Sequence, residues 1–80
     1  MYKYPIGTKV IVTYKETNNT YLGTLTYYNM NSSYPYTFKV EQRININNLS
    51  SSASIGEEIS TADHELTACY VEEGPVIYAT

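Results

Sequence analysis

The side chains of this 80-residue sequence that could do chemistry are its carboxylates, one histidine and one cysteine. His64 lies between Asp63 and Glu65, and Cys69 follows five residues later. A zinc site uses three or four ligands at regular spacing, and this group does not supply that pattern. We therefore expect no metal site. His64 is predicted to lie in a solvated turn and Cys69 to be a small buried residue of a strand.

Two pairs of adjacent glutamates could be considered as the acid and base of a hydrolase, namely Glu57 with Glu58 and Glu72 with Glu73. Neighbouring residues of a strand point to opposite faces, so neither pair forms a catalytic dyad by itself. A cysteine nucleophile would need a base within hydrogen-bond reach, and no glycine-rich phosphate loop is present. We predict no catalytic residue, no cofactor and no enzymatic activity.

Charge is segregated along the chain. All five basic residues precede Ile44 with two acidic residues among them, whereas the rest of the chain carries six carboxylates. Two interpretations stay open: solvated loops with attraction between the two parts, or an acidic face for a basic partner. The net charge of −3 argues against a nucleic-acid-binding surface built from the first lysines and tyrosines.

Tyrosine is unusually abundant, with ten copies against one phenylalanine and no tryptophan. A small core cannot satisfy that many phenolic hydroxyls, so several tyrosines should lie at the surface. They reflect either strand propensity or a recognition surface. The candidate partner-binding residues combine these tyrosines with the acidic side chains: Tyr21, Tyr27, Tyr28, Tyr34, Glu57, Glu58, Asp63, Glu65, Glu72 and Glu73.

The stretch from Tyr21 to Arg43 predicts a β-hairpin that organises the rest of the chain. Residues 21–28 are rich in aromatic residues and threonine, and Gly23 indicates strong curvature or a close backbone approach. Residues 29–33 are typical of a turn. Residues 34–41 alternate with a period of two, which places one row of side chains on the core: Tyr34, Tyr36, Phe38 and Val40.

The flanking segments extend this hairpin into a meander. Residues 8–15 predict a strand with Val10, Val12 and Tyr14 facing inward. Residues 44–56 are rich in asparagine and serine and predict a loop, although residues 44–49 could also extend the preceding strand. The exposed tip of this loop, 50–54, could be shortened without loss of the fold. The remainder predicts short elements: a strand at 57–60, a helical turn at 62–65 capped by Ser60 or Thr61, a strand at 66–71, a turn at 72–75 and a strand at 76–79.

These elements predict an all-β domain spanning residues 1–80: a small barrel of five or six short antiparallel strands with at most one helical turn. Barrel closure would remove exposed strand edges. The segments GTKVIV (7–12), YLGTL (21–25) and YPYTFKVE (34–41) resemble the first three strands of small SH3-like barrels, including Tudor- and KOW-like modules and short bacteriophage proteins. The resemblance covers about residues 7–43 and implies binding rather than catalysis.

A single cysteine excludes an internal disulfide, and neither a signal peptide nor about 20 consecutive apolar residues are evident. We expect a soluble, cytoplasmic protein. The favoured function is an inhibitor or adaptor that docks on a protein with a basic surface, for example a phage product acting on a host or defence protein in the host cytoplasm. The alternatives are a nucleic-acid-binding SH3-like module and an oligomeric sponge for a small molecule or nucleotide. The sequence does not decide whether the protein forms a homo-oligomer.

Overall fold

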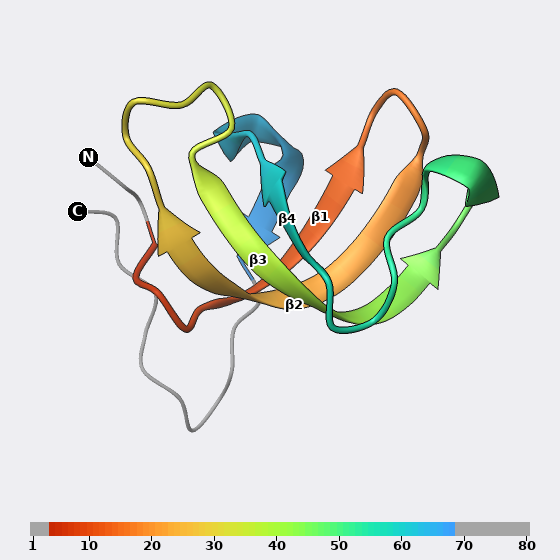
Figure 1. The fold of residues 1–80 in the computed structure, drawn as a ribbon, viewed down its shortest axis with the longest axis horizontal. Coiled ribbons are helices and arrows are strands. Elements are labelled where there is room, and N and C mark those ends of the chain that lie inside the picture. The colour runs from red at the N-terminus through yellow and green to blue at the C-terminus, as the bar shows by residue number, and fades with distance from the viewer. Residues whose placement is uncertain (1–3, 69–80) are drawn as a thin grey trace.

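The computed structural model describes residues 4–68 and is all-β, with five antiparallel strands in one sheet (Figure 1). The prediction of a small all-β protein of short antiparallel strands is confirmed. The strands are β1 (Lys9–Tyr14), β2 (Asn19–Tyr28), β3 (Tyr36–Asn45), β4 (Glu58–Thr61) and β5 (Leu66–Ala68), in the order β4-β3-β2-β1-β5. Helical structure in this part of the chain is limited to two 3₁₀ turns, η1 (Leu49–Ser51) and η2 (Asp63–Glu65).

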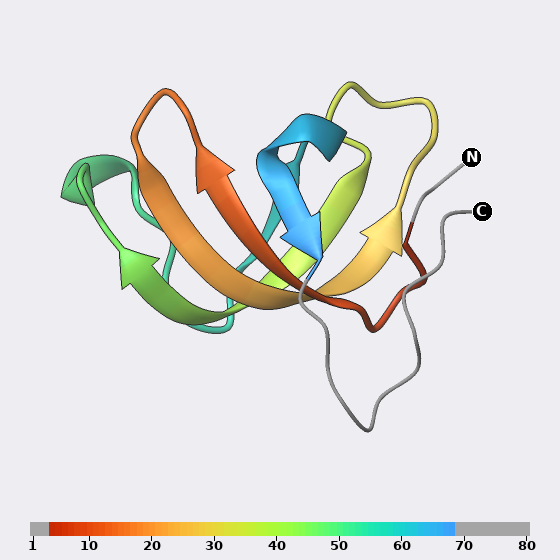
Figure 2. The same ribbon diagram turned by 180° about the vertical axis from the view of Figure 1, so that it is seen from behind.

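The sheet is strongly curved because its two longest strands bend. Figure 1 shows β2 and β3 as bent ribbons. Figure 2, the view from behind, shows the short blue strand β5 beside β1. The β2–β3 register shifts at three places, and such irregularities increase the local twist of a sheet. The curvature brings β4 back towards β1, where the Tyr14 hydroxyl donates a 2.6 Å hydrogen bond to the Ser60 carbonyl oxygen.

Gly23 lies where the backbone of β2 packs tightly against β3. A Cβ atom at this position would lie 2.3 Å from the Lys39 carbonyl oxygen and 2.6 Å from Cδ2 of Phe38. Real Cβ atoms do not approach other heavy atoms this closely, so only glycine fits between the two strands. The predicted close backbone approach at Gly23 is therefore confirmed.

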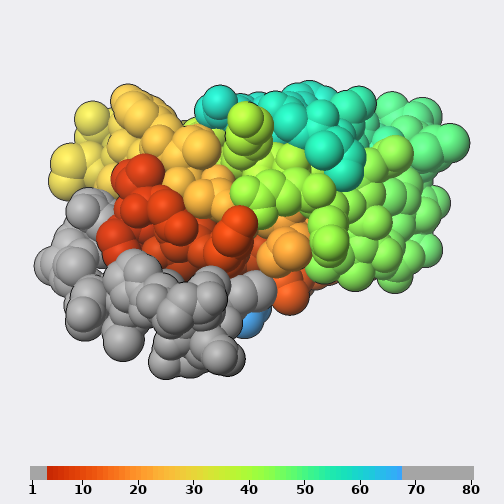
Figure 3. All heavy atoms as spheres, turned by 90° about the horizontal axis from the view of Figure 1, so that it is seen from below, coloured from red at the N-terminus to blue at the C-terminus, as the bar shows by residue number. Residues whose placement is uncertain are grey.

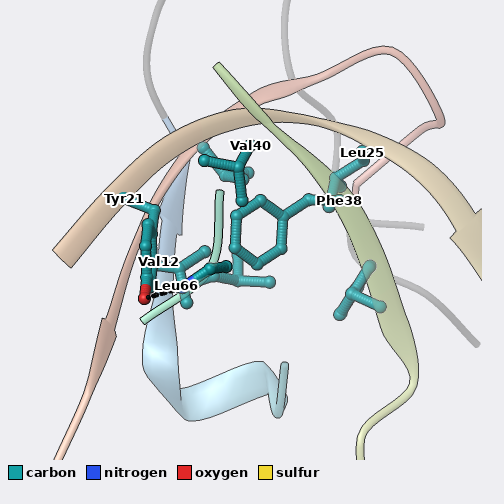
Figure 4. Packing of buried hydrophobic residues seen from close by; sticks show 9 residues of the cluster. Val12, Tyr21, Leu25, Phe38, Val40 and Leu66 are labelled. Carbon is teal, nitrogen blue, oxygen red and sulfur yellow. Dashed lines mark hydrogen bonds between the residues drawn. The ribbon is translucent and has the colours of Figure 1, made fainter. Parts of the chain in front are cut away.

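The core fills the concave side of the sheet (Figure 4). Phe38 is fully buried, and its ring centroid lies 6.4 Å from that of Tyr21. The predicted inward faces of β1 and β3 are confirmed, except that Tyr34 is exposed because β3 begins two residues later, at Tyr36. Tyr14 is half-buried against the same cluster, whose buried members are Val10, Val12, Tyr21, Leu25, Tyr36, Phe38, Val40, Ala53 and Leu66.

The Asn/Ser-rich segment 44–56 is more structured than its composition indicates. Strand β3 continues to Asn45, and η1 forms a single turn whose N-cap is Asn48. The fully buried side chain of Asn19 holds the segment, because its Oδ1 accepts hydrogen bonds from the backbone N–H groups of Asn47 and Asn48. Its Nδ2 also donates to the Asn48 carbonyl oxygen at 3.0 Å. The segment is a loop attached to the start of β2.

The prediction that residues 50–54 form an exposed tip is wrong at Ala53, which is buried. Only 6% of Ala53 is exposed, and its N–H donates a 2.9 Å hydrogen bond to the Tyr21 hydroxyl, drawn in Figure 4. The composition of the segment could not predict this contact, because a run of serine and alanine does not indicate which of its residues will bond to a tyrosine distant in sequence. Deleting residues 51–53 would remove part of the core, so shortening the loop is no longer expected to be harmless.

Changing Tyr21 to phenylalanine should lower the free energy of unfolding by about 1 to 3 kcal/mol, because the buried Ala53 N–H would lose its acceptor. Urea denaturation followed by circular dichroism measures the change. Tyr27→Phe is the matched control, since the Tyr27 side chain is 59% exposed and its hydroxyl can bond to water. Equal stability of Tyr21→Phe and wild type would show that this hydrogen bond does not anchor segment 50–54.

The C-terminal elements agree with the prediction as far as the structure describes them. Strand β4 lies within one residue of the predicted 57–60, and η2 falls within the predicted turn at 62–65. Its N-cap is Ala62, whereas Ser60 or Thr61 was expected; the Thr61 hydroxyl instead donates to Glu65 Oε1 at 3.1 Å. The rest of the predicted strand 66–71, the turn 72–75 and the strand 76–79 lie outside the described residues, as do Cys69, Glu72 and Glu73.

Across residues 4–68, no helix is both long and apolar enough to cross a bilayer.

Candidate binding surfaces

The tip of the β2–β3 hairpin, residues 27–35, carries three exposed large apolar side chains. Tyr27 is 59% exposed, Met30 67% and Tyr34 54%. The sequence has no charged residue between Tyr27 and Phe38. The hairpin tip therefore presents aromatic and thioether surface among asparagine and serine, without charge.

Hydrogen bonds within the hairpin tip fix its shape. The Asn29 N–H donates to the Pro35 carbonyl oxygen at 2.8 Å, and the Ser32 N–H donates to the Asn29 carbonyl oxygen at 3.2 Å. Side chains add two further bonds at 3.0 Å, from the Asn31 N–H to Asn29 Oδ1 and from the Tyr34 N–H to Ser32 Oγ. Asparagine and serine side chains that bond to the nearby backbone are typical of ordered turns. The apolar side chains thus project from a preorganised turn.

The four candidate tyrosines fall into two groups. Tyr27, near the end of β2, and Tyr34, in the turn, are both exposed at the hairpin tip. Tyr28 is half-buried, with its ring centroid 5.0 Å from that of Tyr36, and supports the base of the tip. The assignment of Tyr21 to the surface is wrong: its side chain is 1% exposed because the ring packs in the core and the hydroxyl meets Ala53.

A second surface feature, the seam groove, lies between the β1–β2 turn and β4. Its volume is about 290 Å³. The walls come from segments far apart in sequence, which is why no local motif predicted it. Among the residues that line it are Tyr14, Glu16, Tyr21, Ser52, Glu57 and Ile59.

The seam groove is acidic at its rim. Glu16 and Glu57 are exposed, and no basic residue lines the groove in the described part of the chain. Glu57 Oε1 accepts a 3.0 Å hydrogen bond from the Ser54 N–H, which steadies the carboxylate. Burial, and then the negative charge of Glu65, raise the pKa of the Tyr14 phenol, which lines the groove, well above its ordinary value.

The other predicted acidic residues do not form one face with Glu57. Glu58 Oε1 accepts a 3.1 Å hydrogen bond from the Thr26 hydroxyl. Glu65 Oε1 accepts from the Thr61 hydroxyl and from the Ala62 N–H, so this carboxylate supports η2. Asp63 is exposed. The carboxylates described between residues 57 and 65 therefore divide between the groove, the neighbouring strand and the 3₁₀ turn.

The basic residues are partly engaged within the first part of the chain. Lys9 forms a 2.7 Å ion pair with Glu41, whose second oxygen accepts a 2.7 Å hydrogen bond from the Thr24 hydroxyl. The hydrogen bond from Lys9, followed by that from Thr24, lowers the pKa of the Glu41 carboxyl below its ordinary value. Arg43 donates a 2.8 Å hydrogen bond to Ser52 Oγ. These contacts place Lys9 and Arg43 in separate polar networks.

Residues 4–68 contain no cluster of three or more histidine, cysteine or acidic side chains able to hold a metal ion, and His64 is exposed. Comparison of the chain with family models, with curated proteins and with solved structures gives no match.

Proposed function

We propose that this protein is a non-enzymatic binding protein, an inhibitor or adaptor, which docks on a protein partner through the hairpin tip. The observation that carries the proposal is the set of three exposed apolar side chains on an ordered, uncharged turn. Tyrosine and methionine are enriched in protein interfaces, and tyrosine among serine and asparagine is the composition of antibody binding loops. A turn that is already ordered loses little conformational entropy when it binds.

The charge pattern supports a partner with a basic surface. The protein has a net charge of −3, and exposed carboxylates accelerate encounter with a basic protein more than they raise the final affinity. The strand order β4-β3-β2-β1-β5, with a 3₁₀ turn between β4 and β5, supports the resemblance to SH3-like barrels, which are binding modules. In one version of this proposal, the protein is a phage-encoded inhibitor of a host protein.

The double change Tyr27→Ser and Tyr34→Ser should reduce recovery of the partner by at least about tenfold, because aromatic anchors supply much of an interface's binding energy. Affinity capture from a host lysate, followed by quantitative mass spectrometry, measures the recovery. The matched control is Leu49→Ser with Ile55→Ser, which removes apolar side chains that are 73% and 61% exposed outside the tip. Both variants should keep the stability of the wild type to within about 0.5 kcal/mol per site.

Full recovery of the partner by the tip variant would contradict the proposal. Capture of nucleic acid that is lost on changing Lys15 and Lys39 to glutamine would instead favour the nucleic-acid-binding alternative. Higher salt should slow association with a basic protein partner, because it screens exposed charges.

A further inference from the structure

The seam groove lies at the opposite end of the molecule from the hairpin tip. Strand β2 runs for ten residues from Asn19, beside the groove, to Tyr28, at the base of the tip. Figure 3 shows the same separation, with the yellow hairpin tip at one end and the green segment that contains η1 at the other. Whatever enters the groove therefore does not compete with a partner on the tip.

The size of the groove fits one side chain. Its volume of about 290 Å³ is at the lower limit of ligand pockets, which measure about 300 to 1,000 Å³. The two tyrosine rings that line it are fixed, with centroids 6.0 Å apart and planes at 72°. The Tyr14 hydroxyl is bonded to Ser60 and that of Tyr21 to Ala53, so both rings are held in place.

The charge of the groove selects a cation. Glu16 and Glu57 stand at the rim, and Oε2 of Glu57 is not used by the bond to Ser54. An anionic ligand such as a nucleotide would meet two carboxylates here. A positively charged group would instead gain their attraction together with contact to the half-buried ring of Tyr14.

We propose that the seam groove binds an arginine side chain of a protein partner. A guanidinium is planar, can stack on an aromatic ring such as that of Tyr14 and directs several N–H donors to flanking carboxylates, whereas lysine offers one compact, strongly hydrated charge. The site is independent of the hairpin tip, so it adds a second contact to the proposed function.

The protein's own Arg43 reduces the affinity of this site. Its guanidinium donates to Ser52 Oγ at 2.8 Å, although Arg43 does not itself line the groove. A positive charge at this position repels an incoming arginine. Removing the charge with Arg43→Gln should therefore strengthen binding of an arginine side chain in the groove.

The test is a titration of the ¹⁵N-labelled protein with the blocked tripeptide Gly-Arg-Gly, followed by NMR chemical shifts. We expect saturable shifts at Glu16, Thr17, Ser52 and Ser60, with a Kd of about 1 to 10 mM. Glu16→Gln and Glu57→Gln should each weaken binding by about two- to fivefold, as for exposed ion pairs. Glu58→Gln is the matched control, because it makes the same charge change next to Glu57 at a carboxylate that does not line the groove.

Two comparison peptides complete the test. The peptide with citrulline, which has the shape of arginine without its charge, should give no saturable shift at the groove, and the lysine peptide should bind more weakly. Equal binding of arginine and citrulline, shifts located away from the groove, or no saturation at about 50 mM arginine peptide would overturn the proposal. None of these results depends on the tip, and loss of partner capture by the tip variant leaves the arginine titration unaffected.

Discussion

Replacing Phe38 by alanine should lower the free energy of unfolding by about 3 to 5 kcal/mol and leave much of the chain unfolded at room temperature. The side chain is fully buried in the cluster, and alanine would leave a cavity in the core on the concave side of the sheet. Differential scanning calorimetry and the dispersion of amide signals in NMR spectra measure the loss.

Phe38→Leu provides the control for this experiment, since it keeps the site apolar with a smaller change in volume and should cost clearly less than alanine. A folded Phe38→Ala variant with unchanged stability would mean that the inward and outward faces of β3 are reversed. The side chains of Thr37 and Lys39 would then occupy the core.

Replacing Gly23 by alanine should destabilise the protein by about 3 kcal/mol or more, at the upper end of overpacking effects. The new methyl group would lie 2.3 Å from the Lys39 carbonyl oxygen, and a backbone atom of a paired strand cannot move aside as a flexible side chain can. Either β2 and β3 separate locally or their register changes. Thermal unfolding of the variant measures the effect.

Gly56→Ala separates this mechanism from ordinary glycine strain. Gly56 has φ of +90°, and a Cβ there would meet nothing within 4 Å, so alanine should cost only about 1 to 2 kcal/mol through its backbone conformation. Comparable small losses for both variants would show that β2 and β3 are further apart at Gly23 than the structure places them.

Local sequence patterns predicted the meander well because each strand carries its own signal. Alternation identified the buried faces of β1 and β3, and a glycine within an otherwise aromatic and β-branched strand indicated the close approach at Gly23. The 3₁₀ turn before β5 was also predicted, within one residue at its start. These features depend on residues that are neighbours in sequence or one pleat apart.

The binding surfaces were harder to predict because they depend on distant contacts. Nothing near Tyr21 indicates that its hydroxyl will meet Ala53, 32 residues later, so Tyr21 was placed on the surface. The grouping of acidic residues by sequence likewise missed Glu16, which lines the seam groove together with Glu57 only because the sheet curves. The exposure of Tyr34 depended on where β3 begins, which alternation alone does not fix.

The bond from Tyr14 to Ser60 has a consequence for how this protein behaves at high concentration. Strand β4 is the last strand on its side of the described sheet, and the edge strands of open sheets can pair with other molecules and start aggregation. The Tyr14 hydroxyl donates to the Ser60 carbonyl oxygen and so ties β4 to β1. We therefore expect that removing the Tyr14 hydroxyl leaves the fold nearly complete but increases intermolecular β-pairing at this edge.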